Sequence, residues 1–301
     1  MKIITVLSGK GGTGKTTISS NISLLLSKKK KIVIADCDAD APNLGLSLGV
    51  KEEDFKNWFK VHTNEKSVLI EKKCNGCKKC LNVCNFGAIT WDKKKKIPIF
   101  NSMLCEGCGA CQLICPEKAI KLVKINNGKI GSLKTKYGFS LVSGQLNVGS
   151  TGSGKIVSLI KEEAQKLYKK DNAEIMLLDS AAGVGCPVIA SIQSSDFVVA
   201  VTEPTPSGLS DLKRALRTVE YFQIPYGIII NKYNLNKSFS RKIEKFLNKN
   251  KIPLLGKIPY DKKFVISLVN MVPTIEIYPE YTTLFEDILG NIQKELNNTH
   301  N

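Results

Sequence analysis

Eight of the ten cysteines in this 301-residue chain lie between residues 74 and 115, in two runs with the spacing C-x2-C-x2-C-x3-C. The second run begins 31 residues after the first, and the flanking letters repeat as well: CNGCKKCLNVCNFGAI corresponds to CEGCGACQLICPEKAI. Cysteine thiolates at this spacing can hold a cubane iron–sulfur cluster. The pattern therefore predicts two [4Fe–4S] clusters.

Structural zinc sites and disulfide frameworks also use grouped cysteines. Zinc sites usually pair separated C-x-x-C halves, and disulfide frameworks are typical of short secreted chains, so neither fits well. The repeat resembles that of two-cluster ferredoxins, in which the fourth cysteine of each run ligates the other cluster. This resemblance implies one cluster held by Cys74, Cys77, Cys80 and Cys115 and another held by Cys105, Cys108, Cys111 and Cys84.

A glycine-rich loop near the N-terminus matches the phosphate-binding pattern G-x-x-x-x-G-K-[ST]. It follows an apolar segment at 2–7 and precedes a helical pattern at about 17–28. Glycines in such a loop let backbone N–H groups surround phosphates at a helix N-terminus. Lys15 is expected to reach the β- and γ-phosphates, and the Thr16 hydroxyl to ligate Mg²⁺. The expected nucleotide contacts are Gly9, Lys10, Gly11, Gly12, Thr13, Gly14, Lys15, Thr16 and Thr17.

The extra lysine of this loop, Lys10, makes KGGTGKT similar to the deviant P-loop of the MinD/ParA/nitrogenase-iron-protein superfamily of ATPases. The resemblance covers nearly all of the chain outside the cysteine repeat. The combined pattern resembles MinD-superfamily ATPases with an inserted ferredoxin domain. It implies that ATP and Mg²⁺ bind here and that Lys10 reaches across a dimer interface to the partner's nucleotide. That partner is a second copy of the chain or a paralogous ATPase.

The same resemblance implies two switch segments, DCDAD at 36–40 and DSAAG at 179–183. In the first, Asp38 would orient the attacking water and Asp36 would act near Mg²⁺, whereas Asp40 either joins them or caps the loop. In the second, Asp179 would reach Mg²⁺ through water and Gly183 would lie near the γ-phosphate. The implied catalytic residues are Lys10, Lys15, Asp38 and Asp179, and the implied Mg²⁺ ligands are Thr16, Asp36 and Asp38.

Two further positions match the base-binding side of the family's site. Asn231, in IIINKYN, corresponds to an adenine-reading asparagine, although asparagine after a strand is also a common turn residue. Pro259, in GKIPYD, corresponds to the other contact with the base.

Buried-strand patterns at 2–7, 31–36, 174–179, 196–201, 225–231 and 252–258 alternate with helical patterns at 154–170, 207–222 and 238–249. This alternation predicts a doubly wound, mostly parallel α/β sheet with helices on both faces. Together with the deviant P-loop, it predicts a P-loop ATPase domain over 1–70 and 126–301. An α+β bacterial-type ferredoxin domain is expected to be inserted at 71–125.

Three other features allow more than one interpretation. GSTGSGKI at 149–156 is nearly a P-loop, but Ile156 replaces the Mg²⁺-binding residue and no clear buried strand precedes it, which favours a helix-starting loop over a second nucleotide site. Cys37 is expected to fill space behind the first switch. Cys186 is expected to be a small buried residue; the alternatives are a ligand of a cluster shared between subunits and a redox-responsive thiol.

The chain carries a formal net charge of +17, with lysine clusters at 28–31 and 93–96. This charge indicates either solvated surface or a docking face for an acidic redox partner, and no nucleic-acid motif accompanies it. No membrane span or signal peptide is evident, so we expect a cytoplasmic protein that does not bind membranes.

These patterns favour an ATPase that couples dimer closure to electron transfer through two clusters. The alternatives are an iron–sulfur assembly or carrier ATPase and a MinD/ParA-like positioning ATPase. Positioning relatives end in a basic amphipathic helix that binds lipid. Here the C-terminal apolar stripe has an acidic and mixed polar face, so it is expected to pack on the sheet; it comprises Leu284, Phe285, Ile288, Leu289, Ile292 and Leu296.

Overall fold

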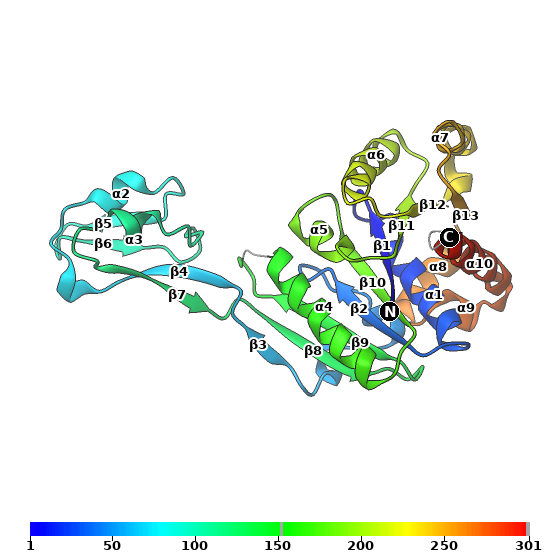
Figure 1. Cartoon of the computed structure of the whole chain (residues 1–301), viewed down its shortest axis with the longest axis horizontal. Coiled ribbons are helices and arrows are strands. Elements are labelled where there is room, and N and C mark those ends of the chain that lie inside the picture. Colours follow the sequence, from blue (N-terminus) through cyan, green and yellow to red (C-terminus); the bar gives the residue numbers. More distant parts are fainter. Residues whose placement is uncertain (151–152, 299–301) are drawn as a thin grey trace. The chain divides into compact units, whose positions relative to one another are not determined.

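The computed structural model describes residues 1–150 and 153–298, and the chain divides into two compact units. The P-loop unit comprises Met1–Trp58, Ile130–Gln145 and Ser153–Asn301. The cysteine unit comprises Phe59–Lys129 and Leu146–Gly152 and contains both cysteine runs. Figure 1 labels the elements of each unit.

A nine-stranded sheet has the order β13-β12-β11-β1-β10-β2-β9-β8-β3. Strand β1 pairs in parallel with β10 and β11, and the pairs β10–β2, β2–β9, β11–β12 and β12–β13 are parallel too. The strands are β1 (Lys2–Ser8), β2 (Ile32–Cys37), β3 (Phe59–Val61), β8 (Gly128–Lys134), β9 (Ser140–Leu146), β10 (Ile175–Ala182), β11 (Phe197–Thr202), β12 (Tyr226–Asn231) and β13 (Leu254–Ile258). The apolar residues of β1, β2, β10, β11 and β12 are nearly all buried on both faces, as expected for parallel strands covered on two sides.

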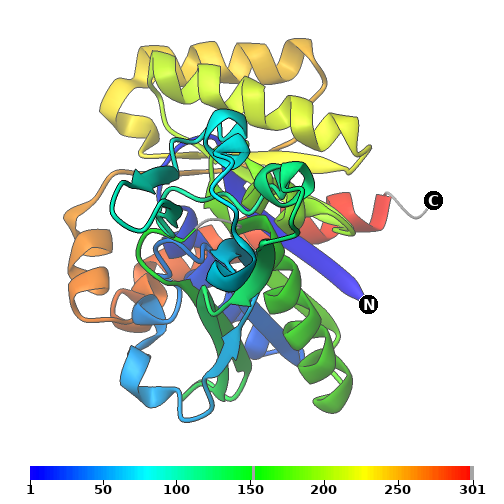
Figure 2. The same cartoon turned by 90° about the vertical axis from the view of Figure 1, so that its left-hand side faces the viewer.

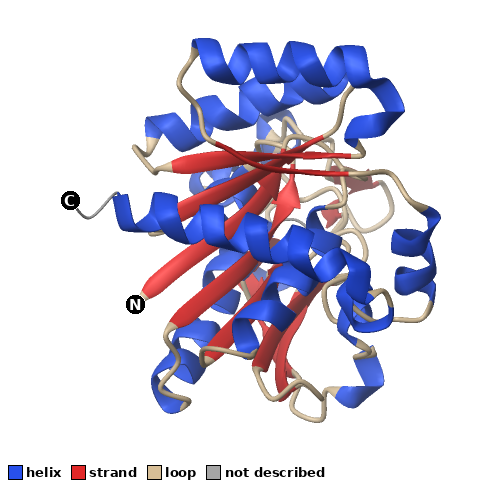
Figure 3. Cartoon of the chain, turned by 90° about the vertical axis from the view of Figure 1, so that its right-hand side faces the viewer, coloured by secondary structure: helices blue, strands red, loops and turns tan. Residues whose placement is uncertain are grey.

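Helices cover both faces of this sheet (Figure 3). One core joins α1 (Lys15–Ser27) and α10 (Thr282–Asn298) to the sheet, and the other joins α5 (Cys186–Ile192), α6 (Pro206–Tyr221) and α7 (Lys237–Lys249) to its opposite face. Two of these helices begin at side-chain caps, since Thr205 accepts a hydrogen bond from the N–H of Gly208 and Asn236 accepts one from that of Phe239. The remaining helices of the P-loop unit are α4 (Ser153–Lys170), α8 (Lys262–Val269), α9 (Thr274–Ile277) and the short 3₁₀ helices Leu46–Leu48, Glu52–Asp54, Tyr233–Asn236 and Pro279–Tyr281.

Helix α4 holds α5 at both of its ends. At the first end, a Cβ atom added to Gly154 would lie 3.0 Å from Cβ of Cys186, so the helices approach closely where α4 has no side chain. At the other end, the buried ammonium of Lys161 donates to the carbonyl oxygens of Ala190 at 2.8 Å and Ser191 at 3.2 Å, and also to that of Gln193. A cation at these carbonyls satisfies the free acceptors of the helix C-terminus.

The cysteine unit is internally duplicated in structure as well as in sequence. Each cysteine run contains one short helix, α2 (Lys79–Val83) or α3 (Ala110–Ile114), and each is followed by a strand. Strand β5 (Ile89–Asp92) pairs antiparallel with β6 (Ile97–Phe100), and β7 (Ile120–Ile125) pairs antiparallel with β4 (Asn64–Leu69). A 3₁₀ helix, Glu71–Lys73, precedes the first run. These elements are coloured cyan to green in Figure 2.

The predicted parallel sheet and its alternating helices are confirmed, with element ends that shift by at most a few residues. The expectation that no buried strand precedes 149–156 is wrong, because β9 is buried along Ser140–Gly144 and pairs with β2. Its mixed letters, SLVSGQL, hid it from a pattern of continuous apolar residues. Helix α4 does begin at Ser153, while Thr151 and Gly152 of this segment lie outside the described residues.

The C-terminal stripe packs as expected. Helix α10 buries Phe285, Ile288, Leu289, Ile292 and Leu296, and Ile288 lies directly over Gly256 of β13. Among residues 1–150 and 153–298, no helix combines the length and apolarity needed to cross a bilayer.

Candidate functional site

The glycine-rich loop joins the central strand β1 to helix α1, which begins at Lys15. Gly14 caps this helix with a φ of 89°, and Gly12 has a φ of 76°; both values favour glycine. Gly9 is required for a different reason, since a Cβ there would lie 2.3 Å from the carbonyl oxygen of Asp211 in α6. The loop conformation therefore requires positive φ angles at Gly12 and Gly14 and close packing against α6 at Gly9.

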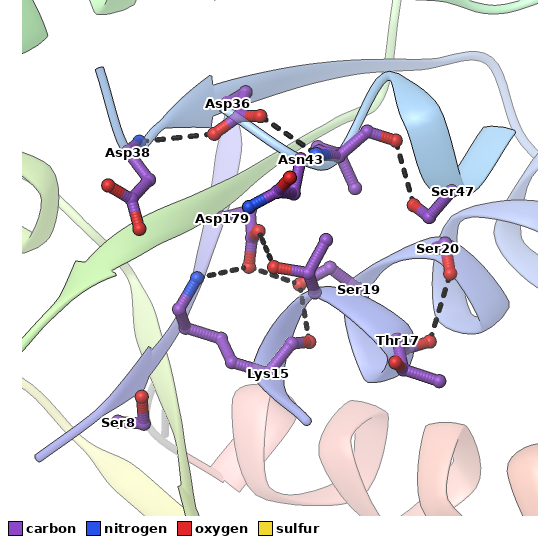
Figure 4. Close-up of polar contacts among 12 residues, drawn as sticks. Ser8, Lys15, Thr17, Ser19, Ser20, Asp36, Asp38, Asn43, Ser47 and Asp179 are labelled. Carbon is purple, nitrogen blue, oxygen red and sulfur yellow. Dashed lines mark hydrogen bonds and ion pairs between the residues drawn. The ribbon is translucent and has the colours of Figure 1, made fainter. Parts of the chain in front are cut away.

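Asp179 lies at the centre of the polar contacts beside this loop (Figure 4). Its carboxylate accepts hydrogen bonds from Lys15 at 3.0 Å, from the Thr16 hydroxyl at 2.7 Å and from the Ser19 hydroxyl at 2.8 Å. Asp179 and Lys15 are both almost fully buried. Burial disfavours the ammonium of Lys15, but Asp179 and Asp36 outweigh this effect and raise the pKa of Lys15.

The strand register places Asp36 of β2 beside Asp179 of β10. Asp36 accepts hydrogen bonds from the N–H of Leu44 at 2.8 Å and from the N–H of Asp38 at 3.1 Å. Burial, together with the negative charge of Asp179, raises the pKa of Asp36 to about 7. Burial also raises the pKa of Asp38. Carboxylates crowded in this way favour a proton or a cation among them.

The donor set at this place fits Mg²⁺, which takes hard oxygen ligands. Oxygen atoms are available on Thr16, Asp36, Asp38 and Asp179, and a divalent cation would relieve the repulsion between the neighbouring carboxylates. Asp40 differs from the other aspartates of its segment. It is exposed and lines a separate pocket with Phe55 and Trp58, whereas Asp38 lines the pocket at the loop.

Two adjoining pockets border the glycine-rich loop. The larger, of about 580 Å³, is lined by Gly11 to Thr17 together with Asp38 and Ala182. The other, of about 220 Å³, is mainly apolar and is lined by Asn231, Pro259, Ile258 and Phe264. Gly12, Gly14 and Leu268 line both pockets. A space bordered by the glycine-rich loop and Lys15, next to a more apolar one, is the arrangement that a nucleotide with phosphates and a flat base requires.

Asn231 is held in place by the loop itself. Its Nδ2 donates to the carbonyl oxygen of Thr13 at 2.7 Å, and its Oδ1 accepts from the N–H of Lys232 at 2.9 Å. A Cβ on Gly14 would lie 2.2 Å from Nδ2 of Asn231, so this contact also depends on a glycine. Asn231 and Pro259 thus line the apolar pocket where the sequence predicted the base.

Residues 4–273 match the family described as the CobQ/CobB/MinD/ParA nucleotide binding domain. The chain belongs to this family. Its nucleotide domain is therefore that of MinD/ParA-type ATPases. MinD of Pyrococcus horikoshii OT3, solved with Mg-ADP, has a TM-score of 0.60 and 18% identity to this chain, covering 99% of it and 98% of the MinD chain. That likeness supports the fold.

Two relatives extend the comparison. The Methanocaldococcus jannaschii protein MJ0578 is 41% identical over 233 residues, which span 77% of this chain and 79% of the relative. The indolepyruvate oxidoreductase subunit IorA of Pyrococcus horikoshii is 35% identical over 77 residues, or 26% of this chain and 11% of that subunit. Most of the chain is thus similar to the CobQ/CobB/MinD/ParA family, and a short stretch of it is similar to an oxidoreductase subunit.

The signature lysine of this MinD/ParA-type domain is paired within its own chain. The ammonium of Lys10 forms an ion pair with Glu203 and contacts the Ser207 hydroxyl at 3.3 Å. The same carboxylate also pairs with Lys232, whose ammonium donates to the carbonyl of Gly12 at 2.9 Å. Lys10 is therefore directed toward the loop that follows β11, at the edge of the glycine-rich loop.

The segment after Asp179 ends β10 and leads into α5. Gly183 has a φ of 99°, and its N–H donates to the carbonyl of Ser8 at 2.9 Å. Cys37 is fully buried, as expected, and burial raises its pKa to about 12. The expectation that Cys186 is buried is wrong, because this residue is exposed at the first position of α5. Pro187, the second residue of the helix, does not cover the thiol.

In the cysteine unit, one pocket is lined by Cys74, Cys77, Cys80 and Cys115, together with Trp91 and Pro98. Three of these cysteines come from the first run and one from the second. Burial raises the pKa of Cys80 to about 11, so this side chain is a neutral thiol unless a metal ligates it as a thiolate. Among residues 1–150 and 153–298, no group of three or more His, Cys, Asp or Glu side chains is arranged to hold a metal ion. The cysteine sulfurs that ligate a cubane cluster lie farther apart than those that ligate a single ion. Four cysteines around one pocket therefore fit a cluster better than a single ion.

The cysteines of the second run contact donors on strand β4. The N–H of Ser67 donates to Sγ of Cys105 at 3.5 Å, and the Ser67 hydroxyl lies 3.1 Å from Sγ of Cys111. Burial opposes ionisation of Cys105, but hydrogen bonds from Ser67 and Gly107 outweigh it and lower the Cys105 pKa. Cys84 is half-buried at the end of α2. Sulfurs that accept hydrogen bonds in this way suit cluster ligands.

The sequence analysis missed several neighbours of the candidate site. Ser19 joins Asp179 because it follows Thr16 by nearly one helical turn, which the helix period could have indicated. Glu203 and Lys232 follow two adjacent strands, β11 and β12, so only the strand order reveals their pairing. Ser67 reaches the second cysteine run through the pairing of β4 with β7, which no local pattern predicts.

Proposed function

We propose that the protein binds and hydrolyses ATP and couples this cycle to electron transfer through two [4Fe–4S] clusters. The observation that carries the redox part is the pocket lined by Cys74, Cys77, Cys80 and Cys115. Three cysteines of one run and the fourth of the other are the set that crossed ligation requires. The short similarity to an oxidoreductase subunit supports the same reading.

In the proposed cycle, Lys15 and the backbone of the glycine-rich loop bind the β- and γ-phosphates in the larger pocket. Thr16, Asp36 and Asp38 would hold Mg²⁺, with Asp179 beside them, and the ion would neutralise phosphate charge. Asp38, which lines the pocket, orients the attacking water. Asn231 and Pro259 receive the adenine.

Dimer closure is the proposed link between the two activities. Lys10 would leave Glu203 and complete the site of a partner, either a second copy of the chain or a paralogous ATPase. In the sequence, both cysteine runs lie between the first switch at 36–40 and the second at 179–183. One switch thus precedes the inserted ferredoxin domain proposed at about 71–125, and the other follows it. A movement of either switch would be passed to that domain along the chain segment that connects them.

The electron donor or acceptor that we propose is an acidic redox protein in the cytoplasm. Exposed Lys78 and Lys79 stand between the ligands of the first run, and Lys93 to Lys96 follow β5. Together they provide a cationic rim that would attract an acidic surface.

The test is reduction of candidate acceptors by the prereduced protein with Mg-ATP, with Mg-ADP and without nucleotide. Coupling predicts that the rate depends on the nucleotide and that this dependence is lost in Lys10→Ala, which retains the phosphate loop. Equal rates in all three conditions, in protein that carries about eight irons per chain, would refute coupling. Rapid, complete transfer of the clusters to an apo-ferredoxin would instead favour a carrier.

A further inference from the structure

The two halves of the cysteine unit differ at two neighbouring pairs of equivalent positions beside the cysteines. The offset of 31 residues between the cysteine runs also holds in the strand register: Ser67 pairs with Leu122, and the equivalent residues Pro98 and Trp91 pair with each other. Ser67 of β4 and Pro98 of β6 therefore occupy matching places. Any difference in what they contact is a difference between the two proposed cluster sites.

Both residues lie beside cysteines, but only one of them offers donors to sulfur. Pro98 lines the pocket that contains Cys74 and Cys80, and proline has no N–H. Ser67 is buried and directs its N–H at Sγ of Cys105, 3.5 Å away, and its hydroxyl at Sγ of Cys111, 3.1 Å away.

The neighbouring position is unequal as well. Lys66 is 5% exposed, and its ammonium donates to the carbonyl oxygen of Cys105. The equivalent residue in the other half is Ile97 of β6, which is neutral. The second cysteine run thus has two hydrogen-bond donors to sulfur and a buried positive charge that the matching place beside the first run lacks.

We propose that Ser67, assisted by Lys66, makes the cluster on Cys105, Cys108, Cys111 and Cys84 the more easily reduced of the two. The inference rests on the proposed function, because it takes these cysteines as cluster ligands. Reduction adds negative charge to a cluster, and hydrogen bonds to its sulfurs and nearby positive charge stabilise that form. Ser67 and Lys66 supply two donors and a buried charge beside the second cluster, whereas beside the first the N–H of Ala119 donates to Sγ of Cys115 at 3.3 Å.

Exposed Lys78 and Lys79 beside the first run act in the opposite direction, but more weakly. Water and salt screen the field of exposed charges more strongly than that of a buried charge. Lys66 is buried, and the hydrogen bonds of Ser67 are made directly to sulfur. The balance therefore favours the second cluster.

A direction of transfer follows from this difference. With both clusters bound, one electron would pass from the cluster of Cys74 to that of Cys105, which would oxidise the first and reduce the second with no proton transferred and no bond made or broken. An electron accepted at the lysine-rimmed side would come to rest beside Ser67. Ser67 is thus a positioning residue that changes the reduction potential of the second cluster without being one of its ligands.

The experiment uses the full-length protein, purified anaerobically and shown to contain about eight irons. Redox titration followed by electron paramagnetic resonance should resolve two midpoint potentials. Ser67→Ala should move the more positive midpoint downward by about tenfold in the reduction equilibrium, or about 59 mV for one electron, and leave the other in place. Ser67→Thr keeps the hydroxyl and should titrate like the wild type. Pro98→Ser should move the more negative midpoint upward.

Thr90→Ala, on the exposed side of β5, is the neutral control. Coincident midpoints in the wild type, an equal shift of both clusters in Ser67→Ala, or the same shift in Ser67→Thr would overturn the inference. Protein without iron would overturn the inference and the proposed redox function together. Split potentials that respond to Ser67→Ala but ignore ATP would support the inference and remove only the coupling.

Discussion

The ammonium of Lys10 lies 2.5 Å from Oε1 of Glu203, and Lys232 approaches the other carboxylate oxygen at 3.3 Å. Although burial opposes ionisation of Glu203, hydrogen bonds and charge from the two lysines lower its pKa. In the single chain, the lysine expected to cross a dimer interface is therefore already occupied. In the proposed dimer closure, Lys10 would therefore have to leave Glu203.

Replacing Glu203 with glutamine should make ATP-dependent dimerisation easier, because Lys10 then has no ion pair to leave. A partly exposed pair of this kind contributes about 1 kcal/mol or less, or about fivefold per protomer, so the dissociation constant of a homodimer, which breaks two such pairs, should fall by about 30-fold at most. Light scattering with a slowly hydrolysed ATP analogue measures it. Glu163→Gln, which removes the ion pair with Lys166, is the control. Weaker dimerisation in Glu203→Gln would contradict the prediction.

Asp36 predicts a pH dependence of stability in the absence of Mg²⁺ and nucleotide. Its pKa is about 7 in the folded protein and ordinarily 3.8, so the folded state retains a proton that the unfolded chain releases between about pH 4 and 7. Stability therefore falls as pH rises through this window. Asp36→Asn should raise Tm more at about pH 8 than at about pH 5, whereas exposed Asp40→Asn should not. With Mg-ATP present the advantage should disappear; a Tm gain independent of pH would refute this account.

Two glycines of the phosphate loop should respond differently to alanine. At Gly9 a Cβ would lie 2.3 Å from a backbone oxygen of Asp211, which cannot move aside, so Gly9→Ala should lower the free energy of unfolding by about 1–3 kcal/mol and weaken ATP binding. At Gly11 no heavy atom lies within 4 Å of the added Cβ, so Gly11→Ala should change stability by less than about 0.5 kcal/mol. Thermal melts and ATP titrations of both variants test this; equal effects would show that packing against α6 is unimportant.

Crossed ligation predicts a non-additive loss of iron. Cys74→Ser and Cys115→Ser should each remove the same cluster, so the double variant should retain about four irons, as each single variant does. Cys74→Ser combined with Cys84→Ser should remove both clusters. Iron analysis of anaerobic preparations distinguishes these cases. If the pair Cys74 and Cys84 retained one cluster, each run would instead ligate its own.

The two cysteines outside the repeat should differ in reactivity. Cys186 is exposed, whereas Cys37 is fully buried, and burial raises its pKa to about 12. A maleimide should therefore label the cluster-loaded native protein at Cys186 and react with Cys37 only after unfolding. Mass spectrometry locates the label, and Cys186→Ser should abolish native labelling. Rapid labelling of Cys37 in the native protein would contradict the described packing.

Much of the fold could be predicted because parallel strands buried on both faces leave long apolar runs. Segments such as 174–179 and 225–231 contain little else, and helices with a regular polar face separate them. Strand β9 escaped because serine, glycine and glutamine interrupt its apolar residues, although neighbouring elements bury it. Its pairing with β2 is a tertiary effect that local letters do not encode.

For the candidate site, the sequence predicted residues that share a short motif better than residues that meet through the sheet. Lys15 and Thr16 are set by one loop, whereas the bonds of Asp179 to both of them depend on strand β10 lying next to β1. Cys186 shows a different limit, since a small residue before proline can begin a helix in the open as well as in a core. Pairings such as Lys10 with Glu203 required the three-dimensional structure.

The double attachment between α4 and α5 limits how the P-loop unit can deform. Gly154 brings the two helices together at the start of α5, and Lys161 fastens its end. A rotation or slide of α5 alone would break backbone contacts at one extremity and drive atoms together at the other. We therefore expect α4 and α5 to move together as one rigid body, about the chain segment that joins the second switch to α5.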